Sequence, residues 1–385
     1  MCCRVVVFGI TGSIGSGAEK IISVFPEKFK LVGCSAGKNI NLLNRFLSKH
    51  QGSIEAVAVL DENDKEKVEF NSDKIYHGKE GLFDLLDLKP DKIINAISGN
   101  SGWKITLESV KRGIPVCLAN KESVVIAGYY LGKEITTDRS KIIPIDSEHA
   151  ALMQIIENRE MDDITKVYLT ASGGALRNMS ASQMVEADAE TALKHPVWDM
   201  GAKVTVDSAT MLNKGLELIE AYWLFGIEPE KLGVIVHPEV DVHAALMFKD
   251  GSSISQLAPS SMLIPIAAAL SYPEMLPVAE RIEDLKFSYF GKKMSFDPPD
   301  LDKYVLLKIA FDLLQKRDYS GMLAYAVADE VAVERFLKNE IKVKGIHTIV
   351  SQTVSRFSGL VPPDNEKEID DLISKIETFA LNIVF

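Results

Sequence analysis

Residues 4–24, RVVVFGITGSIGSGAEKIISV, decide the fold of the N-terminal part of this 385-residue chain. Residues 4–8 form a short apolar run typical of a buried strand, and glycines follow at positions 9, 12 and 15 before a stretch that predicts a helix to about Val24. Strand, glycine turn and helix in this order are the context that a dinucleotide-binding fingerprint requires. The spacing is G-x-x-G-x-x-G rather than G-x-G-x-x-G, so a tight turn without a nucleotide is the alternative.

A second strand, expected over Lys30–Ala36, ends in Gly37, Lys38 and Asn39. Enzymes that use NAD usually place an acid here, where it binds the ribose 2′-hydroxyl. A lysine and an asparagine suit a 2′-phosphate instead, so the sequence predicts NADPH rather than NADH. The alternative is a polar loop that leads into a helix over Leu42–Lys49.

Strands and helices continue to alternate along the first half of the chain. Further apolar strands are expected over residues 54–60, 92–97, 115–119 and 141–145. This alternation predicts an α/β fold with a doubly wound, Rossmann-type parallel sheet. Ligands bind at the carboxyl ends of strands in such sheets, and polar clusters follow two of these strands, at residues 120–122 and 146–149.

The composition is that of an ordinary globular protein, with 46% hydrophobic and 25% charged residues. The length favours two or three domains. A formal net charge of −11 argues against nucleic acid as the main partner. An anionic substrate would need local basic residues, for which Lys121, Lys214 and His195 are the candidates.

The N-terminus runs directly into a strand, without the features of a signal or transit peptide, and no apolar run approaches the roughly 20 residues of a membrane span. A cytoplasmic protein is therefore expected. Four cysteines in or beside apolar runs lack C-x-x-C spacing, which predicts buried reduced thiols rather than a zinc site: Cys2, Cys3, Cys34 and Cys117.

Asp146 and Glu148 lie two residues apart at the end of an expected strand. In an extended segment their side chains would point to the same side, and two adjacent carboxylates repel unless a cation or a proton lies between them. Oxygen ligands without cysteine favour Mg²⁺ or Mn²⁺. A third ligand is expected from elsewhere, and Glu217 is the best candidate. The alternative is a pair of N-terminal acids on a helix over Ala150–Glu157.

Residues 195–221, HPVWDMGAKVTVDSATMLNKGLELIEA, concentrate polar groups of many kinds. The run Ala202–Val206 predicts a short strand, after which Ser208 would cap a helix that begins near Ala209. The N-terminus of such a helix suits a phosphate.

Asn213, Lys214 and Glu217 share one face of this expected helix. A solvated face with a Lys–Glu pair is the commoner explanation for such spacing. The many apolar residues of the same helix predict that it is buried, so that its polar groups need partners.

Ser172 and two glycines follow an expected strand over Lys166–Thr170. This pattern lets backbone amides approach an anion, although it is also the pattern of a simple turn. His195 and Trp198 lie in a segment that contains a proline, where structural roles are the alternative to substrate contact.

Several motifs together resemble the 1-deoxy-D-xylulose 5-phosphate reductoisomerase family. The stretches GITGSIG, AGKN, LANKES, IPIDSEHAA, LTASGGALR and residues 195–221 occur in the family's order from residue 9 to about residue 226. DEVAVER and FLKNEIKVKGIH resemble the C-terminal helical domain, so the resemblance covers nearly the whole chain.

The resemblance implies a cofactor site and a metal site at matching positions. The NADPH pyrophosphate would lie against Thr11, Gly12, Ser13 and Ile14. The adenosine ribose phosphate would face Gly37, Lys38 and Asn39, and the nicotinamide end would contact Asn120, Glu122 and Gly201. Mg²⁺ or Mn²⁺ would be held by Asp146, Glu148 and Glu217.

The resemblance also implies where a phosphorylated sugar substrate would bind. Its phosphate or nearby hydroxyls would contact Ser172, Ser208, Asn213 and Lys214, while its backbone would be lined by Lys121, Ser147, Glu148, His195 and Glu217. Trp198 and Met200 would belong to a closing loop. The residues expected to act in catalysis are Lys121, Asp146, Glu148, His195 and Glu217.

The reaction implied is rearrangement of 1-deoxy-D-xylulose 5-phosphate and its reduction by NADPH to 2-C-methyl-D-erythritol 4-phosphate, in isoprenoid precursor biosynthesis, by a homodimer. The expected organisation is an NADPH-binding domain, a central α+β catalytic domain, a linker and a C-terminal helical bundle, over residues 1–144, 145–272, 273–300 and 301–385. Two other functions stay open: another NADP-dependent dehydrogenase of an acid or semialdehyde, and a non-catalytic NADPH-binding protein.

The chain departs from the family's usual pattern in three places. His-Pro-Gln-Ser is replaced by His-Pro-Glu-Val at residues 237–240, and Pro-Asp-Met-Arg by Ser-Ser-Met-Leu at residues 260–263. An Asn-Ala-Ala-Asn-Glu run is replaced by Ala-Val-Ala-Asp-Glu at residues 326–330. The departures concern packing and cofactor contacts rather than the metal or phosphate positions.

Overall fold

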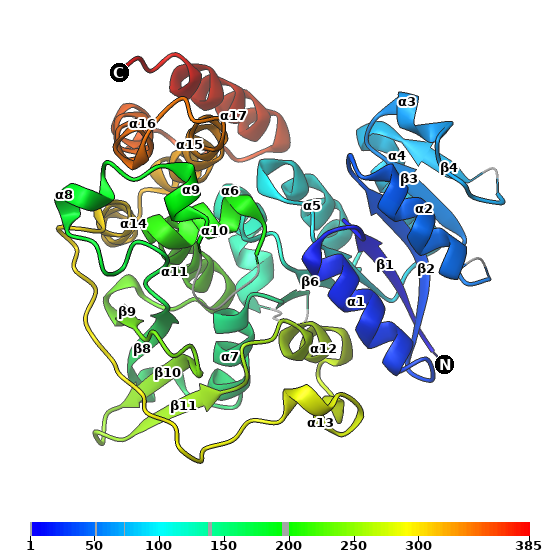
Figure 1. Ribbon diagram of the computed structural model, residues 1–385, viewed down its shortest axis with the longest axis horizontal. Coiled ribbons are helices and arrows are strands. Elements are labelled where there is room, and N and C mark those ends of the chain that lie inside the picture. Colours follow the sequence, from blue (N-terminus) through cyan, green and yellow to red (C-terminus); the bar gives the residue numbers. More distant parts are fainter. Residues whose placement is uncertain (1, 51, 73, 138–140, 195–199) are drawn as a thin grey trace. The chain divides into compact units, whose positions relative to one another are not determined.

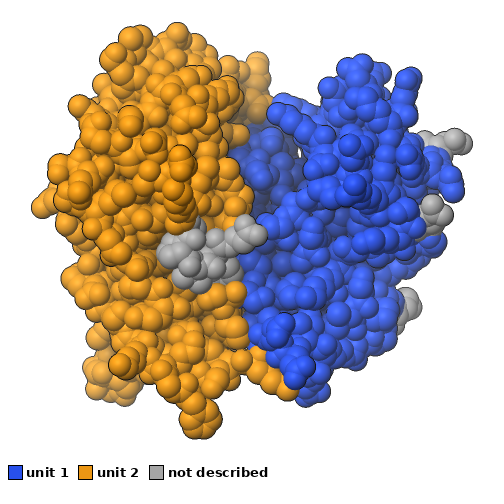
Figure 2. Space-filling view, viewed as in Figure 1, with its two compact units in different colours: residues 1–120, 138–150, 261–285 blue, residues 121–137, 151–260, 286–385 orange. Residues whose placement is uncertain are grey.

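The computed structural model describes residues 2–50, 52–72, 74–137, 141–194 and 200–385. Its elements are labelled in Figure 1. The chain forms two compact units, coloured blue and orange in Figure 2. The first consists of residues 1–120, 138–150 and 261–285, and the second of residues 121–137, 151–260 and 286–385.

The first unit is built on a seven-stranded parallel sheet, with strand order β4-β3-β2-β1-β5-β6-β7. This arrangement confirms the predicted doubly wound α/β fold. The order reverses around β1, which is the place where such sheets bind ligands. The strands are β1 Cys3–Phe8, β2 Phe29–Ala36, β3 Ala56–Val59, β4 Ile75–His77, β5 Lys92–Asn95, β6 Val116–Leu118 and β7 Ile142–Pro144.

Apolar strands and amphipathic helices form the core of this unit. Val5, Val6, Val7 and Phe8 of β1 are fully buried, as expected for a strand covered on both faces. The helices are α1 Ser13–Val24, α2 Ile40–Lys49, α3 Glu62–Lys65, α4 Gly78–Asp84, α5 Trp103–Lys111, α12 Leu263–Ser271 and α13 Val278–Arg281. One further helix, α7 Ser147–Ile156, begins in the first unit and ends in the second.

The second unit contains a four-stranded sheet with strand order β11-β10-β8-β9. Its strands are β8 Ile164–Ala171, β9 Leu232–Val236, β10 Val242–Phe248 and β11 Ser253–Leu257. The pairs β10–β11 and β10–β8 are antiparallel, which fits the expected α+β domain. Strand β9 pairs with β8 in parallel, because α10 and α11 carry the chain between them.

The helices of the second unit include the predicted C-terminal bundle. They are α6 Lys121–Thr137, α8 Ala181–Met184, α9 Ala189–Ala192, α10 Ala202–Thr210, α11 Leu212–Phe225, α14 Val305–Lys316, α15 Tyr319–Leu337, α16 Val343–Phe357 and α17 Glu366–Leu381. Helix α15 packs against α14, α16 and α17 (Figure 1). Side chains cap two of the four helices α14–α17: Asp318 accepts from Gly321 N at the start of α15, and Asn365 accepts from Glu368 N at the start of α17.

The strand predicted over Ala202–Val206 is wrong, because these residues form the first half of α10. The β-branched residues Val204, Thr205 and Val206 suggested a strand, but tertiary packing overrides so weak a preference. Thr205 and Val206 are buried, and the Thr205 hydroxyl donates to the carbonyl of Gly201 one turn earlier, at 3.0 Å. Ser208 therefore lies near the end of α10 and does not cap the next helix.

The four cysteines are free thiols. Cys34 and Cys117 are buried in the parallel sheet, and burial raises the pKa of each thiol to about 12. Cys2 and Cys3 are half-buried. Among the described residues, no helix is both long and apolar enough to cross a membrane.

Candidate active site

The turn between β1 and α1 has the geometry that a nucleotide-binding turn needs. Gly9 has a φ of 85°, and a Cβ there would lie 2.6 Å from the carbonyl oxygen of Ala96. A Cβ on Gly15 would lie 2.4 Å from the carbonyl oxygen of Gly9, so this glycine permits close packing of helix against strand. Gly12 is the N-cap of α1 and has no side chain to occupy the first N–H groups, which suits an anion at this helix end.

The loop after β2 supplies the predicted 2′-phosphate residues. Strands β1 and β2 are neighbours, so the loop at residues 37–39 lies at the same sheet edge as the turn at residues 11–14. Lys38 is exposed, as a residue that meets a phosphate from solvent should be. Asn39 has a structural role as well, because its side-chain oxygen accepts a hydrogen bond from Leu42 N at 3.2 Å and caps α2.

The residues predicted at the nicotinamide end are anchored by hydrogen bonds and ion pairs. Asn120 is buried, and its amide donates to the carbonyl of Gly99 at 2.7 Å. Glu122 lies in the first turn of α6 and pairs with Lys203 Nζ at 3.1 Å. Gly201 is exposed and is the N-cap of α10.

The three predicted metal ligands come together. Asp146, Glu148 and Glu217 each offer a carboxylate oxygen, and these ligand atoms lie within 4.8 Å of one another. Three facing carboxylates repel each other, and hard oxygen donors of this kind fit Mg²⁺ or Mn²⁺. Glu217 is 1% exposed, so its charge cannot be stabilised by bulk water.

Asp146 and Glu148 lie at the start of a helix, as the alternative to a metal site predicted, and still belong to the group of three carboxylates. The extended geometry expected from the sequence is wrong, because Glu148 lies in the first turn of α7. Asp146 Oδ1 accepts from the backbone N–H of Glu148 at 3.2 Å, which is the hydrogen bond of an N-cap. Ser147 donates from its hydroxyl to Glu148 Oε2 at 2.9 Å. The cap fixes the directions of both carboxylates.

A network of cations and an amide surrounds Glu217. Lys121 Nζ lies 3.0 Å from Glu217 Oε1 and 2.9 Å from Asn213 Oδ1. The amide of Asn213 and the ammonium of Lys214 also donate to Glu217. The predicted shared face of Asn213, Lys214 and Glu217 is therefore confirmed as a contact, and the side chains of Lys121, Lys214 and Glu217 are all buried.

The residues predicted to bind the substrate phosphate lie on three neighbouring segments. Ser172 follows β8, and its hydroxyl accepts from Gly174 N at 3.1 Å. A Cβ on Gly174 would lie 2.5 Å from the carbonyl oxygen of Ser208, so this turn is packed against the end of α10. Asn213 and Lys214 lie in the first turn of α11, directly after. Hydroxyls, an amide and an ammonium are the donors that a phosphate needs.

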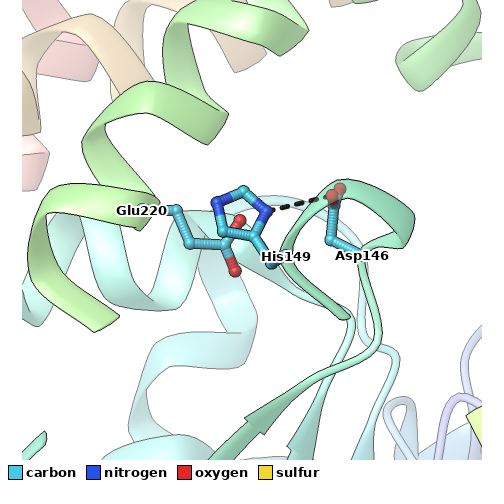
Figure 3. A group of neighbouring side chains, drawn as sticks. All are labelled: Asp146, His149 and Glu220. Carbon is cyan, nitrogen blue, oxygen red and sulfur yellow. Dashed lines mark hydrogen bonds and ion pairs between the residues drawn. The ribbon is translucent and has the colours of Figure 1, made fainter. Parts of the chain in front are cut away.

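The sequence did not predict that two buried side chains, His149 and Glu220, lie beside Asp146. Asp146, His149 and Glu220 form a second group whose ligand atoms lie within 4.8 Å of one another (Figure 3). His149 Nδ1 lies 3.0 Å from Asp146 Oδ1, and both His149 and Glu220 are buried. Such residues orient a ligating carboxylate. The spacing of Asp146 and His149 could have suggested the pair, whereas Glu220 could not be placed without the fold.

Lys203 and Asp207 were also missed, because the strand predicted over Ala202–Val206 includes Lys203 and ends directly before Asp207, which concealed their helical i, i+4 spacing. Among the predicted site residues, His195 and Trp198 lie outside the described residues. Met200 is described and half-buried, directly before the N-cap of α10. The roles of the individual site residues remain predictions.

Comparison with known proteins identifies the family. A family model described as 1-deoxy-D-xylulose 5-phosphate reductoisomerase matches residues 5–128. The model of that enzyme's C-terminal domain matches residues 142–225, and a further DXP reductoisomerase C-terminal domain model matches residues 257–379.

Relatives of this name are similar over nearly their whole length. The 1-deoxy-D-xylulose 5-phosphate reductoisomerase of Macrococcus caseolyticus is 37% identical over 367 residues, which cover 94% of this chain and 96% of that relative. The protein of the same name from Thermotoga neapolitana is 38% identical over 379 residues, covering 97% and 95%.

Solved structures agree in fold. A crystal structure of DOX-P reductoisomerase in complex with NADPH, fosmidomycin and magnesium has a TM-score of 0.88 and 31% identity, covering 98% of this chain and 97% of that one. The Zymomonas mobilis enzyme in complex with NADPH has a TM-score of 0.87 and 28% identity, covering 99% and 98%. On this similarity in sequence and structure, the chain belongs to the 1-deoxy-D-xylulose 5-phosphate reductoisomerase family.

Proposed function

We propose that this protein converts 1-deoxy-D-xylulose 5-phosphate to 2-C-methyl-D-erythritol 4-phosphate with NADPH and Mg²⁺ or Mn²⁺, a step of isoprenoid precursor biosynthesis. One observation carries the proposal beyond family membership. The ligand atoms of Asp146, Glu148 and Glu217 lie within 4.8 Å of one another, and α11 presents Asn213 and Lys214 beside the last of these. One proposed metal ligand, Glu217, thus lies on the same helix as the proposed phosphate donors Asn213 and Lys214.

The chemistry of the donor set fits the metal. When bound, Mg²⁺ or Mn²⁺ supplies Lewis acidity to the substrate's carbonyl and adjacent hydroxyl oxygens. Asp146, Glu148 and Glu217 would hold it, and His149 keeps the carboxylate of Asp146 oriented. Lys121 reaches Glu217 directly, so it offsets part of the negative charge of the three ligands.

In the proposal, the phosphate group of the substrate takes no part in the rearrangement and is bound by its own set of donors. Ser172, Ser208 and the first turn of α11 supply neutral and cationic donors there. Binding energy from such a remote group is available to hold the carbon skeleton in the geometry of the rearrangement. Lys121, Ser147 and His195 line the substrate backbone, and Trp198 and Met200 belong to the closing loop.

Two glycine-containing segments hold the cofactor in the proposal. NADPH supplies the hydride that reduces the rearranged aldehyde. The turn at residues 11–14 binds its pyrophosphate, and Lys38 binds the 2′-phosphate. Asn120, Glu122 and Gly201 contact the nicotinamide end.

We propose a homodimer and a cytoplasmic location as finer details. The edge strand β11 of the four-stranded sheet is mostly exposed or half-buried, which supports an interface at this edge. Light scattering during size-exclusion chromatography should then give twice the chain mass of 42.4 kDa. A mass equal to one chain would remove the dimer from the proposal.

The test of the function is NADPH oxidation by purified protein with 1-deoxy-D-xylulose 5-phosphate and Mn²⁺. Oxidation should stop with EDTA and return when excess Mn²⁺ is added. Oxidation that continues in EDTA would favour a metal-independent dehydrogenase. Bound NADPH without any oxidation would favour a non-catalytic NADPH-binding protein.

A further inference from the structure

Four ionisable side chains from three helices meet around Lys203 in the second unit. Lys203 Nζ lies 2.8 Å from Asp207 Oδ2 on the same helix, α10. It also lies 2.5 Å from Asp329 Oδ2 on α15 and 3.1 Å from Glu122 Oε1 on α6. We name these four residues the Lys203 cluster. Asp207 and Asp329 are 1% and 0% exposed, whereas the Lys203 side chain is 19% exposed, so solvent is excluded from the two aspartates.

The Lys203 cluster has more acceptors than donors. An ammonium has three N–H groups, and each meets one of the three carboxylates. The second oxygens of Asp207 and Asp329 are buried, and no hydrogen-bond donor among the described residues reaches either. With every carboxylate ionised, Asp207 and Asp329 would add two buried negative charges to the ion pair of Lys203 with Glu122. One proton on the Asp207–Asp329 pair removes one of these charges and supplies the missing donor.

Electrostatics places that proton on the aspartates. Burial and the neighbouring Asp207 carboxyl raise the pKa of Asp329 well above its usual value, against the effect of Lys203. Burial also raises the pKa of Asp207, although Lys203 and a hydrogen bond with Asp329 oppose it. Burial alone would also raise the pKa of Glu122, but the attraction of Lys203 contributes to a net lowering of that pKa. Glu122 is thus the ionised partner of Lys203.

Further titratable groups lie on α15 and on the helices that pack against it. Tyr325 lies one turn earlier on α15, and burial raises its pKa well above the usual value, so it stays neutral. His347 of α16 is neutral above about pH 4, since burial lowers its pKa to about 4. Helix α11 carries Lys214 and Glu217, which pair with each other, and Glu220, which lies in the group with His149. The buried residues of α14 and α17 are apolar.

We propose that Asp207 and Asp329 share one proton, and that this proton keeps Lys203 directed at Glu122 so that the first turns of α10 and α6 are held together. Asp329 is then a positioning residue, acting on the cofactor through Lys203 and Glu122. The second half of the inference rests on the proposed function, because it takes Glu122 and Gly201 to lie at the nicotinamide end.

A substitution at position 329 can remove the titrating proton while keeping the hydrogen bonds of the Lys203 cluster. An asparagine amide at this place would supply the same hydrogen-bond donor without a titration. Asp329→Asn should therefore keep the cluster and remove its dependence on pH. Asp312→Asn removes an exposed carboxylate of α14 and is the matched control.

The first measurement is the folding equilibrium of wild type and Asp329→Asn across pH, by urea unfolding without cofactor. The pKa of the aspartate pair is higher in the folded protein than in the unfolded chain. The stabilising effect of the shared proton is therefore complete at pH values below the aspartate pKa of the unfolded chain. It is lost as pH rises through the folded pKa. The folded-to-unfolded ratio of Asp329→Asn relative to wild type should rise with pH, by up to about tenfold per pH unit for one proton. A ratio that is flat with pH, as expected for Asp312→Asn, would overturn the shared proton.

The second measurement is the NADPH dissociation constant of the same proteins across pH, by fluorescence. Wild type should lose affinity relative to Asp329→Asn as pH rises through the pKa of the folded protein, where the stability ratio stops rising, because only there does the folded protein release the proton. Equal pH profiles, with the stability difference still present, would overturn the positioning role and leave the proton in place. Absence of NADPH binding in either protein would overturn the positioning role together with the proposed function, while unfolding still decides the proton.

Discussion

Lys121 Nζ lies 3.0 Å from Glu217 Oε1, and both side chains are buried. The lysine is the first residue of α6, whereas the glutamate lies in the second turn of α11, so the ion pair joins two helices. Lys214 meets the other carboxylate oxygen of Glu217. A proposed metal ligand is thereby positioned by two cations from two helices, and its charge is needed for structure as well as for metal binding.

Glu217→Gln should abolish turnover while leaving NADPH binding nearly intact. The amide is a poorer ligand for a hard cation. The proposed pyrophosphate and 2′-phosphate residues lie elsewhere, in the turn between β1 and α1, at the start of α1 and in the loop after β2. We expect kcat to fall more than about a hundredfold, beyond what loss of an outer-sphere group causes. Steady-state kinetics and NADPH fluorescence measure the two effects. Glu230→Gln, at an exposed position, is the control, and wild-type turnover in Glu217→Gln would remove Glu217 from the metal site.

Lys38→Asp should shift cofactor preference from NADPH toward NADH. The change removes a charge-assisted hydrogen bond to the 2′-phosphate and introduces a repelling carboxylate, so the ratio of kcat/KM for the two cofactors should fall about 10- to 100-fold. Lys20→Asp makes the same change of charge at an exposed position on α1. A cofactor ratio that moves equally in both variants would show that Lys38 makes no specific contact.

Gly174→Ala should destabilise the protein and weaken substrate binding together. Gly174 has a φ of 68°, and its Cβ would lie 2.5 Å from the carbonyl oxygen of Ser208 and 2.6 Å from Ala209 Cα. Gly251 has a φ of 84° with nothing within 4 Å, so Gly251→Ala measures the backbone strain alone, about 1–2 kcal/mol. Thermal unfolding should show the larger loss for Gly174→Ala, with a raised KM for the substrate. Equal losses in the two variants would mean that the turn does not position Ser208.

The parallel sheet could be predicted because the sequence pattern of each strand is local and recurs along the chain. Each strand is a short apolar run followed by a turn and a helix, and this order permits few topologies. The strand β4 was missed, since Ile75–His77 is only half-buried and lacks a continuous apolar pattern. The pairing of β9 with β8 could not be inferred either, because it joins strands that are distant in sequence.

The sequence was sufficient to predict which residues belong to the candidate site, but not how most of them are arranged in space. Glu217 was expected beside Asn213 and Lys214 from helical spacing alone, and the structure agrees. The Lys203–Asp207 pair has the same i, i+4 spacing, but it was hidden by the incorrect strand over Ala202–Val206. Asp329 lies more than a hundred residues further along the chain, so only the packing of α15 against α10 brings it to Lys203.

The most direct test of the account is the identity of the product when purified protein, NADPH, Mn²⁺ and 1-deoxy-D-xylulose 5-phosphate react to completion. Carbon and phosphorus NMR should show 2-C-methyl-D-erythritol 4-phosphate, with one molecule formed for each NADPH consumed and none formed in EDTA. A product with the unbranched carbon skeleton of the substrate, or NADPH consumption without a branched product, would contradict it.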